Sequence, residues 1–412
     1  MLAAILSVRS LLLAIFMLMA GSGFLATLLG LRLEASGTSA MLIGLVAASY
    51  FVGLTVGSLQ VSKIIRSVGH IRAFAAFVSL FSASTLTYAV HQDVLLWAGL
   101  RFVDGLCMAG VFICLESWLN ERAEPEARGV VLAAYMIFLY AGQALGQFLL
   151  NLSDTKPSMP FMAAAILLSL AVIPVVLTRI ASPSVEDQAP LSVGSLYRVS
   201  PLGMVGANVT GLMLGAFYGL GAVYARRLGM DLATTALFMS SVILGGVALQ
   251  WPLGRLSDRF DRRKIIVLAF VGAASASLLI ALVGTPGPGL MLIASLFGGM
   301  TFALYPLCVA HTNDHLTRAQ RVGASGGLVL VYSIGAAAGP LAGAAAMSAF
   351  GPKGLFLLTA SCAAIALAFA FYRQWSALPV PDAQQQPYQI LPRTTPMSAV
   401  LDPLAPTQAA KD

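Results

Sequence analysis

Three ionisable residues lie within one long apolar stretch of the sequence. Arg101, Asp104 and Glu116 all fall between Leu95 and Leu119. At about 100° per helical residue, Asp104 lies roughly 60° to one side of Arg101 and Glu116 roughly 60° to the other. One face of a helix therefore holds all three. A charge at the centre of a membrane helix costs at least ~2.5–3.5 kcal/mol, so this face should meet water or a charged partner.

Two interpretations of Arg101 and Asp104 are open. They could line a polar cavity that binds a solute or a proton, with Asp104 as the main coupling acid and Arg101 setting its affinity. Alternatively, they form an i, i+3 ion pair that only orders the helix. For Glu116, near the end of the stretch, we expect a structural ion pair with Arg66, Arg122 or another loop base, and a proton site is the alternative.

Neutral polar residues continue the pattern in the next apolar stretch. Tyr140, Gln143, Gln147 and Asn151 recur at steps of three and four, which places them in one stripe along a helix. The stripe would either line a cavity or form hydrogen bonds between helices.

Metal and thiol chemistry are not indicated by the sequence. The four cysteines lie inside apolar stretches without CxxC or metal-ligand spacing, and the four histidines lie near the ends of such stretches. We expect buried thiols, no metal site and no cofactor.

The elements that hold these residues are predicted to be membrane helices. The chain is 58% hydrophobic and 10% charged, whereas soluble domains are typically about 25% charged. Twelve apolar stretches approach the ~20 residues that a helix needs to cross a bilayer. They are Leu11–Leu31, Met41–Val61, Ala73–Val90, Leu95–Leu119, Val130–Leu150, Pro160–Leu177, Pro201–Tyr224, Leu232–Leu253, Ile265–Val283, Leu290–Ala310, Val322–Met347 and Leu355–Tyr372.

The basic residues predict the orientation. Eighteen of the 24 Lys and Arg residues fall on the side that carries both termini, five fall on the other side, and Arg101 lies within a span. This asymmetry predicts cytoplasmic termini in a bacterial inner membrane, and it argues against nucleic-acid binding despite the net charge of +7. The first span is too long for a signal peptide and lacks an A-x-A-like site, so we expect an uncleaved helix.

The polar segments divide the chain. We expect a six-helix bundle over residues 1–179, a cytoplasmic linker over 180–200, a second six-helix bundle over 201–372, and a disordered cytoplasmic tail over 373–412, which is rich in Pro and Gln. The fold class expected is an all-α membrane protein with twelve helices in two halves.

The two halves repeat each other. A constant shift of 193 residues superposes Gly105 on Gly298, Asn120 on Asn313, Arg128 on Arg321, Gly142 on Gly335 and Gly146 on Gly339, and it places Glu121 on Asp314. Six matches at one offset indicate a duplication. Two parallel six-helix halves around a midplane site are a known transporter architecture.

The loop after the eighth span carries the most specific motif. It runs from Gly254 through Arg255, Leu256, Ser257, Asp258, Arg259, Phe260, Asp261, Arg262 and Arg263 to Lys264. This resembles the G-x-L-x-D-R-x-G-R-R/K signature of the major facilitator superfamily, except that Asp261 replaces the second glycine. The equivalent loop after the second span keeps glycines and basic residues but lacks the aspartate.

Other stretches resemble the same family. Residues 101–105 are similar to its R-x-x-x-G motif, and residues 335–343 look like its glycine–proline motif, which drug antiporters carry in the fifth span. Here the fifth span lacks the proline, which argues against a drug antiporter. Residues 116–122 and 68–72 resemble the YcaD-like branch of bacterial facilitators, whose substrate is unknown.

The resemblance implies roles for particular residues. Gly254, Asp258, Arg259, Arg262 and Arg263 would form a gating loop, in which Asp258 would bridge to the eleventh span in one conformation. Spans one, four, seven and ten surround the solute path in this family, so Asn208, Tyr218 and Tyr305 would join Gln143 there, with aromatic packing as the alternative for each tyrosine. The residues that would pack helices together are Gly142, Gly146, Gly335, Gly339 and Pro340.

The function expected is secondary transport of a small solute by alternating access. Proton coupling is expected, export is slightly favoured, and no ATP-binding loop is found. A membrane enzyme centred on His311–His315, or a transport fold used as a receptor, is the alternative. Because Arg101 and Asp104 would cancel, small neutral, zwitterionic or amphipathic solutes are favoured. The expected partners are the solute, protons and lipid, and the protein is expected to be a monomer.

Overall fold

The computed structural model describes residues 2–178, 191–376, 385–390 and 393–395, and those residues contain helices but no strand. Twelve helical segments are long and apolar enough to cross a membrane, which confirms the predicted all-α, twelve-span class. The short helices are α1 (Leu2–Ser7), η1 (Pro125–Ala127) and α9 (Val193–Val199). The others are α2 (Arg9–Ser22), α3 (Leu25–Ala35), α4 (Ala40–Val68), α5 (His70–Val90), α6 (Val94–Arg122), α7 (Arg128–Gly146), η2 (Gln147–Asp154), α8 (Met159–Val176), α10 (Pro201–Arg227), α11 (Leu232–Ser257), α12 (Arg262–Val283), α13 (Pro288–Asn313), α14 (Arg318–Phe350) and α15 (Gly354–Ser376).

Polar side chains define where several of these helices begin. Ser39, Asp93 and Asp231 accept hydrogen bonds from the backbone N–H groups of Leu42, Leu96 and Thr234, respectively. Such caps satisfy amide groups that have no partner within the helix. Two predicted spans are interrupted, because the first divides into α2 and α3 and the fifth ends in the 3₁₀ segment η2.

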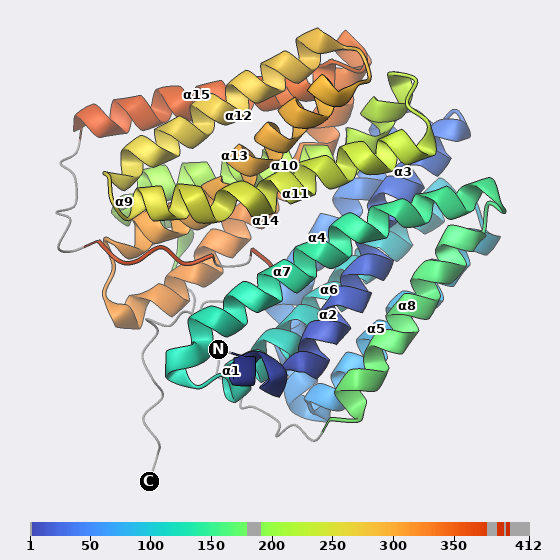
Figure 1. Ribbon diagram of the computed structural model, residues 1–412, viewed down its shortest axis with the longest axis horizontal. Coiled ribbons are helices and arrows are strands. Elements are labelled where there is room, and N and C mark those ends of the chain that lie inside the picture. Colours follow the sequence, from blue (N-terminus) through green and yellow to red (C-terminus); the bar gives the residue numbers. More distant parts are fainter. Residues whose placement is uncertain (1, 179–190, 377–384, 391–392, 396–412) are drawn as a thin grey trace.

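The helices form two groups that lie side by side, α2–α8 and α10–α15 (Figure 1). The predicted duplication is visible in how two equivalent glycines pack. A Cβ atom on Gly105 of α6 would lie 2.0 Å from the carbonyl oxygen of Tyr50, and one on Gly298 of α13 would lie 1.9 Å from that of Val242. The first half therefore needs glycine where α6 crosses α4, and the second half needs glycine where α13 crosses α11.

The two groups of helices touch near one end of the molecule, here called the Glu34 face. Arg227, at the end of α10, makes a two-pronged ion pair with Glu34 of α3, at 2.7 and 2.9 Å. Gly44 of α4 lies against Pro340 of α14, where an added Cβ would be 2.7 Å from the proline carbonyl oxygen. The opposite end, which carries the Asp258 loop, is called the Asp258 face.

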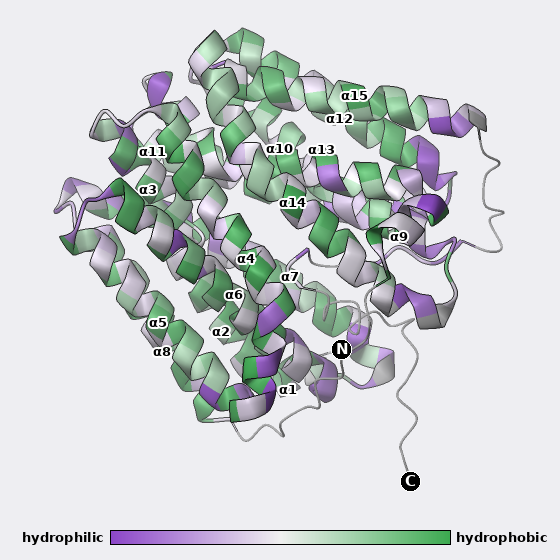
Figure 2. Cartoon of the chain, turned by 180° about the vertical axis from the view of Figure 1, so that it is seen from behind, coloured by the Kyte–Doolittle hydropathy of each residue, from purple (hydrophilic) through white to green (hydrophobic). Residues whose placement is uncertain are grey.

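Apolar side chains cover the outside of the helices. Leu59, Leu95, Ile166, Leu282 and Ile365 are each more than half exposed. Figure 2 shows hydrophobic residues along the helices and hydrophilic ones gathered at their ends. This distribution suits a bilayer as the surrounding solvent.

The linker and the tail differ from expectation in part. The polar stretch before the seventh span contains helix α9, while residues 180–190 of the predicted linker lie outside the described residues. Helix α15 extends to Ser376, and residues 385–390 and 393–395 lie against the helices. The prediction of a disordered tail is wrong for those residues, because their backbone and side chains find polar partners on the helices.

Candidate functional site

A cavity of about 140 Å³ lies between the two halves. Helices of the first half contribute Met19, Tyr50, Phe51, Arg101, Phe112, Tyr140 and Gln143, and the second half contributes Tyr218, Gly219 and Tyr332. Arg393 and Thr394, from beyond the last helix, complete one wall. The lining is mostly apolar and aromatic with few polar groups, which is the usual composition of a small-molecule site.

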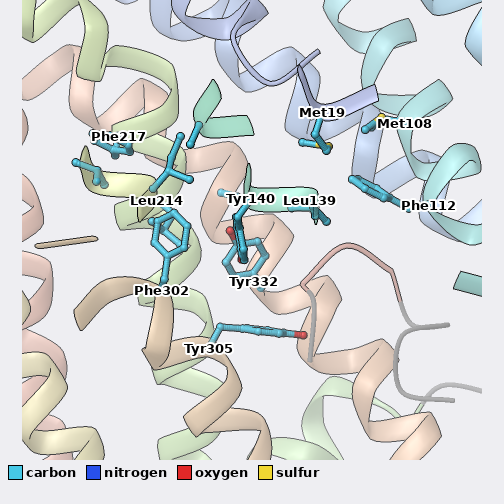
Figure 3. Close-up of a cluster of buried hydrophobic side chains, with 14 of the residues drawn as sticks. Met19, Met108, Phe112, Leu139, Tyr140, Leu214, Phe217, Phe302, Tyr305 and Tyr332 are labelled. Carbon is cyan, nitrogen blue, oxygen red and sulfur yellow. The ribbon is translucent and has the colours of Figure 1, made fainter. Parts of the chain in front are cut away.

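Aromatic rings join the halves beside this cavity (Figure 3). The ring of Tyr140, from α7, lies 5.5 Å from that of Phe302, from α13. Tyr218 lies 6.2 Å from Phe302, and Tyr305 lies 5.2 Å from Tyr332 in an edge-to-face arrangement. The contact of Tyr140 with Phe302 joins the two halves through aromatic rings, and such a contact can separate at modest cost.

Arg101 and Asp104 form a buried pair at 3.6 Å. The Arg101 guanidinium lines the cavity and stands 4.2 Å from the centre of the Tyr50 ring. Asp104 is fully buried behind Arg101, where the Tyr88 hydroxyl donates a hydrogen bond to Oδ2 at 2.6 Å. The structure thus contains the i, i+3 pair and also places one of its members at the cavity.

Glu116 has different surroundings from those expected. Its carboxylate is fully buried and accepts hydrogen bonds from the hydroxyls of Tyr135, Thr394 and Thr395. Among the described residues its hydrogen-bond partners are therefore hydroxyl groups, where the sequence predicts an ion pair with Arg66, Arg122 or another loop base. The reason is that the threonines after the last helix cover the carboxylate.

The other predicted cavity residues divide into two sets. Gln143 and Tyr218 line the cavity, and the Tyr218 hydroxyl lies 3.5 Å from Gln143 Oε1, across the two halves. Asn208 instead donates to the carbonyl of Val331 at 3.0 Å, between α10 and α14. Tyr305 is packed against Tyr332 and is 1% exposed. The last two residues therefore serve helix packing in this conformation.

The predicted packing residues lie where helices meet. A Cβ atom on Gly142 would be 2.4 Å from the carbonyl oxygen of Phe16, and one on Gly146 would be 2.5 Å from that of Ala20. Gly335 and Gly339 bring α14 equally close to the backbone of α10. The predicted stripe on the fifth span is also used between helices, since Gln147 donates to the carbonyl of Gly23 at 3.1 Å.

The predicted gating loop is organised around Arg262. Its guanidinium contacts Asp258 at 3.3 Å and Asp314 at 2.5 Å, and it donates to the carbonyl oxygen of Gln386 at 2.6 Å. Among the described residues Asp258 pairs with Arg262 of α12, whereas the resemblance implies a bridge to the eleventh span in one conformation. Arg263 pairs with Asp261 at 2.8 Å, while Arg259 is exposed.

Two carboxylates of this loop region have shifted pKa values in opposite directions. Burial raises the pKa of Asp314, although the nearby Arg262 guanidinium opposes the shift. Asp261 is partly desolvated, but hydrogen bonds from Arg263 outweigh this and lower its pKa. The neighbouring histidines take part in local contacts, with His315 Nδ1 2.9 Å from the carbonyl oxygen of His311.

The sequence does not indicate that the segment after the last helix contributes to the site. The backbone N–H groups of Gln386 and Tyr388 donate to Asp314 and Asp258 at 2.9 and 2.8 Å, and the Tyr388 ring lies against Gly254. Its composition predicts disorder, and no periodic pattern points to the helices. Only the single arginine among Pro, Gln and Thr residues could have suggested an acidic or aromatic partner.

In the described part of the chain, no group of three or more His, Cys, Asp or Glu side chains is placed to hold a metal ion. The arrangement is chemically suited to binding, because aromatic faces and guanidinium groups line a space between two similar halves.

Comparisons with known proteins agree with this architecture. Uncharacterised MFS-type transporters named YcaD are 29% identical in Salmonella arizonae, over 87% of this chain and 94% of the relative, and 30% identical in Escherichia fergusonii, over 79% and 85%. The nucleoside transporter NupG superposes with a TM-score of 0.75 at 14% identity, covering 90% of this chain and all of NupG. The E. coli fucose:proton symporter FucP reaches a TM-score of 0.56 at 15% identity, covering 90% and 99%.

The family profile gives the same answer. The profile described as Major Facilitator Superfamily matches residues 11–247 and, again, residues 203–403. Together the two matches extend over both halves, as the duplication requires. The chain belongs to the Major Facilitator Superfamily.

Proposed function

We propose that this protein is a proton-coupled secondary transporter that moves a small solute through the cavity between its halves by alternating access. The observation that carries the proposal is the position of the cavity. It is lined from both halves, and the contacts of Glu34 with Arg227 and of Gly44 with Pro340 join the halves on one face. Rocking of the halves about such a site is the usual mechanism of this architecture.

Arg101 and Asp104 are proposed to carry the coupling. Arg101 reaches the cavity while Asp104 lies behind it, so a solute or a rocking movement that draws the guanidinium away would leave the carboxylate buried without its counter-charge. Burial then favours the protonated form. Proton uptake would follow the movement of Arg101, which is what coupling requires. Export is the proposed direction, supported by the strength of the Gly254–Lys264 loop motif.

The test follows two distances in the same protein by double electron–electron resonance. Spin labels at Ser36 and Thr285 report on the Glu34 face, and labels at Ser67 and Lys264 report on the Asp258 face; all four residues are exposed. Lowering the pH should shift the population of each labelled pair between two distances. The distance on one face should lengthen as the distance on the other face shortens. Asp104→Asn should abolish the pH dependence, whereas Glu116→Gln should retain it.

The proposal fails if both pairs keep one distance at every pH. If the distances alternate but Glu116→Gln alone removes the pH dependence, the proton site is Glu116 and the assignment to Asp104 is wrong.

A further inference from the structure

The guanidinium of Arg393, in one wall of the cavity, is held in the manner of a bound cation. Its guanidinium carbon lies 4.5 Å from the centre of the Phe302 ring and 5.8 Å from that of Tyr332, and it reaches the Tyr218 hydroxyl at 3.5 Å. Both ring distances are within the ~6 Å range of cation–π attraction. Aromatic faces of this kind recognise guanidinium and quaternary ammonium groups.

The next two residues engage the acid of the opposite half. Thr394 and Thr395 each donate a hydroxyl hydrogen bond to the carboxylate of Glu116 on α6. The segment therefore touches α10, α13 and α14 through Arg393 and touches α6 through the threonines. A segment that holds both halves at once opposes their rocking.

Two acids lie near the cavity, and only one of them has a described cationic partner. Arg101 is compensated by Asp104 at 3.6 Å. The described partners of Glu116 are hydroxyls, which leave its charge without a counter-ion. In its ionised form Glu116 would add a negative charge beside the cavity that none of its described partners neutralises. The expectation of a neutral solute counted only Arg101 and Asp104 and did not include Glu116.

The path of the segment to the cavity is also built from specific contacts. Asp314 and Asp258 accept the backbone N–H groups of Gln386 and Tyr388, and Arg262 donates to the Gln386 carbonyl. Tyr388 covers Gly254, where a side chain would leave no room. The loop predicted to gate the transporter is thereby contacted by the same segment that forms one wall of the cavity.

We infer that the cavity takes a small organic monocation, a guanidinium or quaternary ammonium compound with an apolar substituent, and that Arg393 competes with it as a tethered occupant. The inference rests on the proposed function in taking this cavity as the solute path. The solute's charged group would lie at the rings of Phe302 and Tyr332, and Glu116 would supply the counter-charge once Thr394 and Thr395 have left.

The experiment measures binding of phenylguanidinium and of its neutral isostere phenylurea to the purified full-length protein by calorimetry. Arg393→Ala should bind phenylguanidinium about tenfold more tightly than the unmodified chain if the arginine fills the site for nine-tenths of the time. Phenylurea should bind more weakly to the variant than phenylguanidinium. Arg198→Ala is the matched control, because Arg198 is an exposed arginine on α9, and it should change neither affinity.

Two second substitutions in the Arg393→Ala protein locate the cation. Glu116→Gln should abolish the preference for phenylguanidinium over phenylurea. Phe302→Leu keeps an apolar side chain but removes the ring, and it should weaken phenylguanidinium binding about two- to thirtyfold. This variant tests the site even if Glu116→Gln does not fold.

The inference is overturned if Arg393→Ala does not increase the affinity for phenylguanidinium, or if phenylurea binds the variant equally well. These results are distinct from failure of the proposed function. Cation binding without pH-dependent alternation would overturn the transport mechanism alone, and alternation without cation binding would overturn only the inference.

Discussion

At the scale of single residues, the central feature is the buried guanidinium of Arg101, which contacts both the cavity and Asp104. Arg101 faces the cavity on one side and Asp104 on the other, and Asp104 has the Tyr88 hydroxyl as its second partner. Removing one member of a buried pair leaves the other uncompensated, which typically costs about 3–5 kcal/mol, whereas removing both can be nearly neutral.

A double-mutant cycle on this pair has a definite expected result. Asp104→Asn should lower the thermal unfolding midpoint by several degrees, because the Arg101 guanidinium then remains buried without a counter-charge. Adding Arg101→Gln to Asp104→Asn should restore part of the loss, although each substitution alone destabilises the protein. The measurement is thermal unfolding in detergent, followed by tryptophan fluorescence. If the change in unfolding midpoint of the double variant equals the sum of the changes in the two single variants, the two charges do not stabilise each other.

At the scale of helices, the two halves use glycine for the same purpose. Gly105 lets α6 reach the backbone of α4, and Gly298 lets α13 reach the backbone of α11. Gly99 lies on α6 as well, but a Cβ atom there would meet nothing within 4 Å. The chain therefore supplies its own control for a helix-packing experiment.

Gly105→Ala and Gly298→Ala should each destabilise the protein by about 1–3 kcal/mol, because a methyl group would overlap a carbonyl oxygen of the crossing helix. Gly99→Ala should be neutral or slightly stabilising, since alanine favours helix over glycine. Unfolding midpoints of the three variants provide the measurement. Equal behaviour of Gly99→Ala and Gly105→Ala would show that the close crossing does not matter.

The helices could be predicted far better than the site. Apolar stretches of membrane length and the 193-residue repeat depend on local composition, and they gave the twelve spans and the matched pairs Gly105–Gly298 and Gly142–Gly335. Arg101, Gln143 and Tyr218, which the helix period and the family resemblance assign to a cavity, are among its lining residues. The partners of Glu116 could not be predicted, since Thr394 and Thr395 lie almost 280 residues away along the chain. Long-range hydrogen bonds of an irregular segment leave no periodic signal.

At the scale of the whole molecule, the distribution of basic residues predicts how the chain lies in the bilayer. The Asp258 face carries most of the Lys and Arg residues, and the Glu34 face carries few. Cytoplasmic loops are enriched in these residues. The Asp258 face should therefore be cytoplasmic.

Single cysteines offer a direct test of this orientation. Reporters at Gln92 and Lys353 should react with an impermeant maleimide in intact cells, whereas one at Arg259 should react only after the membrane is made permeable. All three positions are exposed, and three of the four native cysteines are buried. Labelling of Arg259→Cys in intact cells would show that the orientation is opposite to the predicted one.

The position of Arg393 also affects how strongly any solute can appear to bind. Arg393 is covalently joined to α15, which ends at Ser376, so its local concentration at the cavity does not change when the protein is diluted. For a group held on a short linker that concentration is on the order of millimolar. A freely diffusing cation of equal intrinsic affinity would therefore need millimolar concentrations to displace it. Ligand screens on the intact chain would then miss compounds that fit the cavity. Removing the residues after α15 would raise the apparent affinity of the protein for a cation, although every lining residue on the helices would be unchanged.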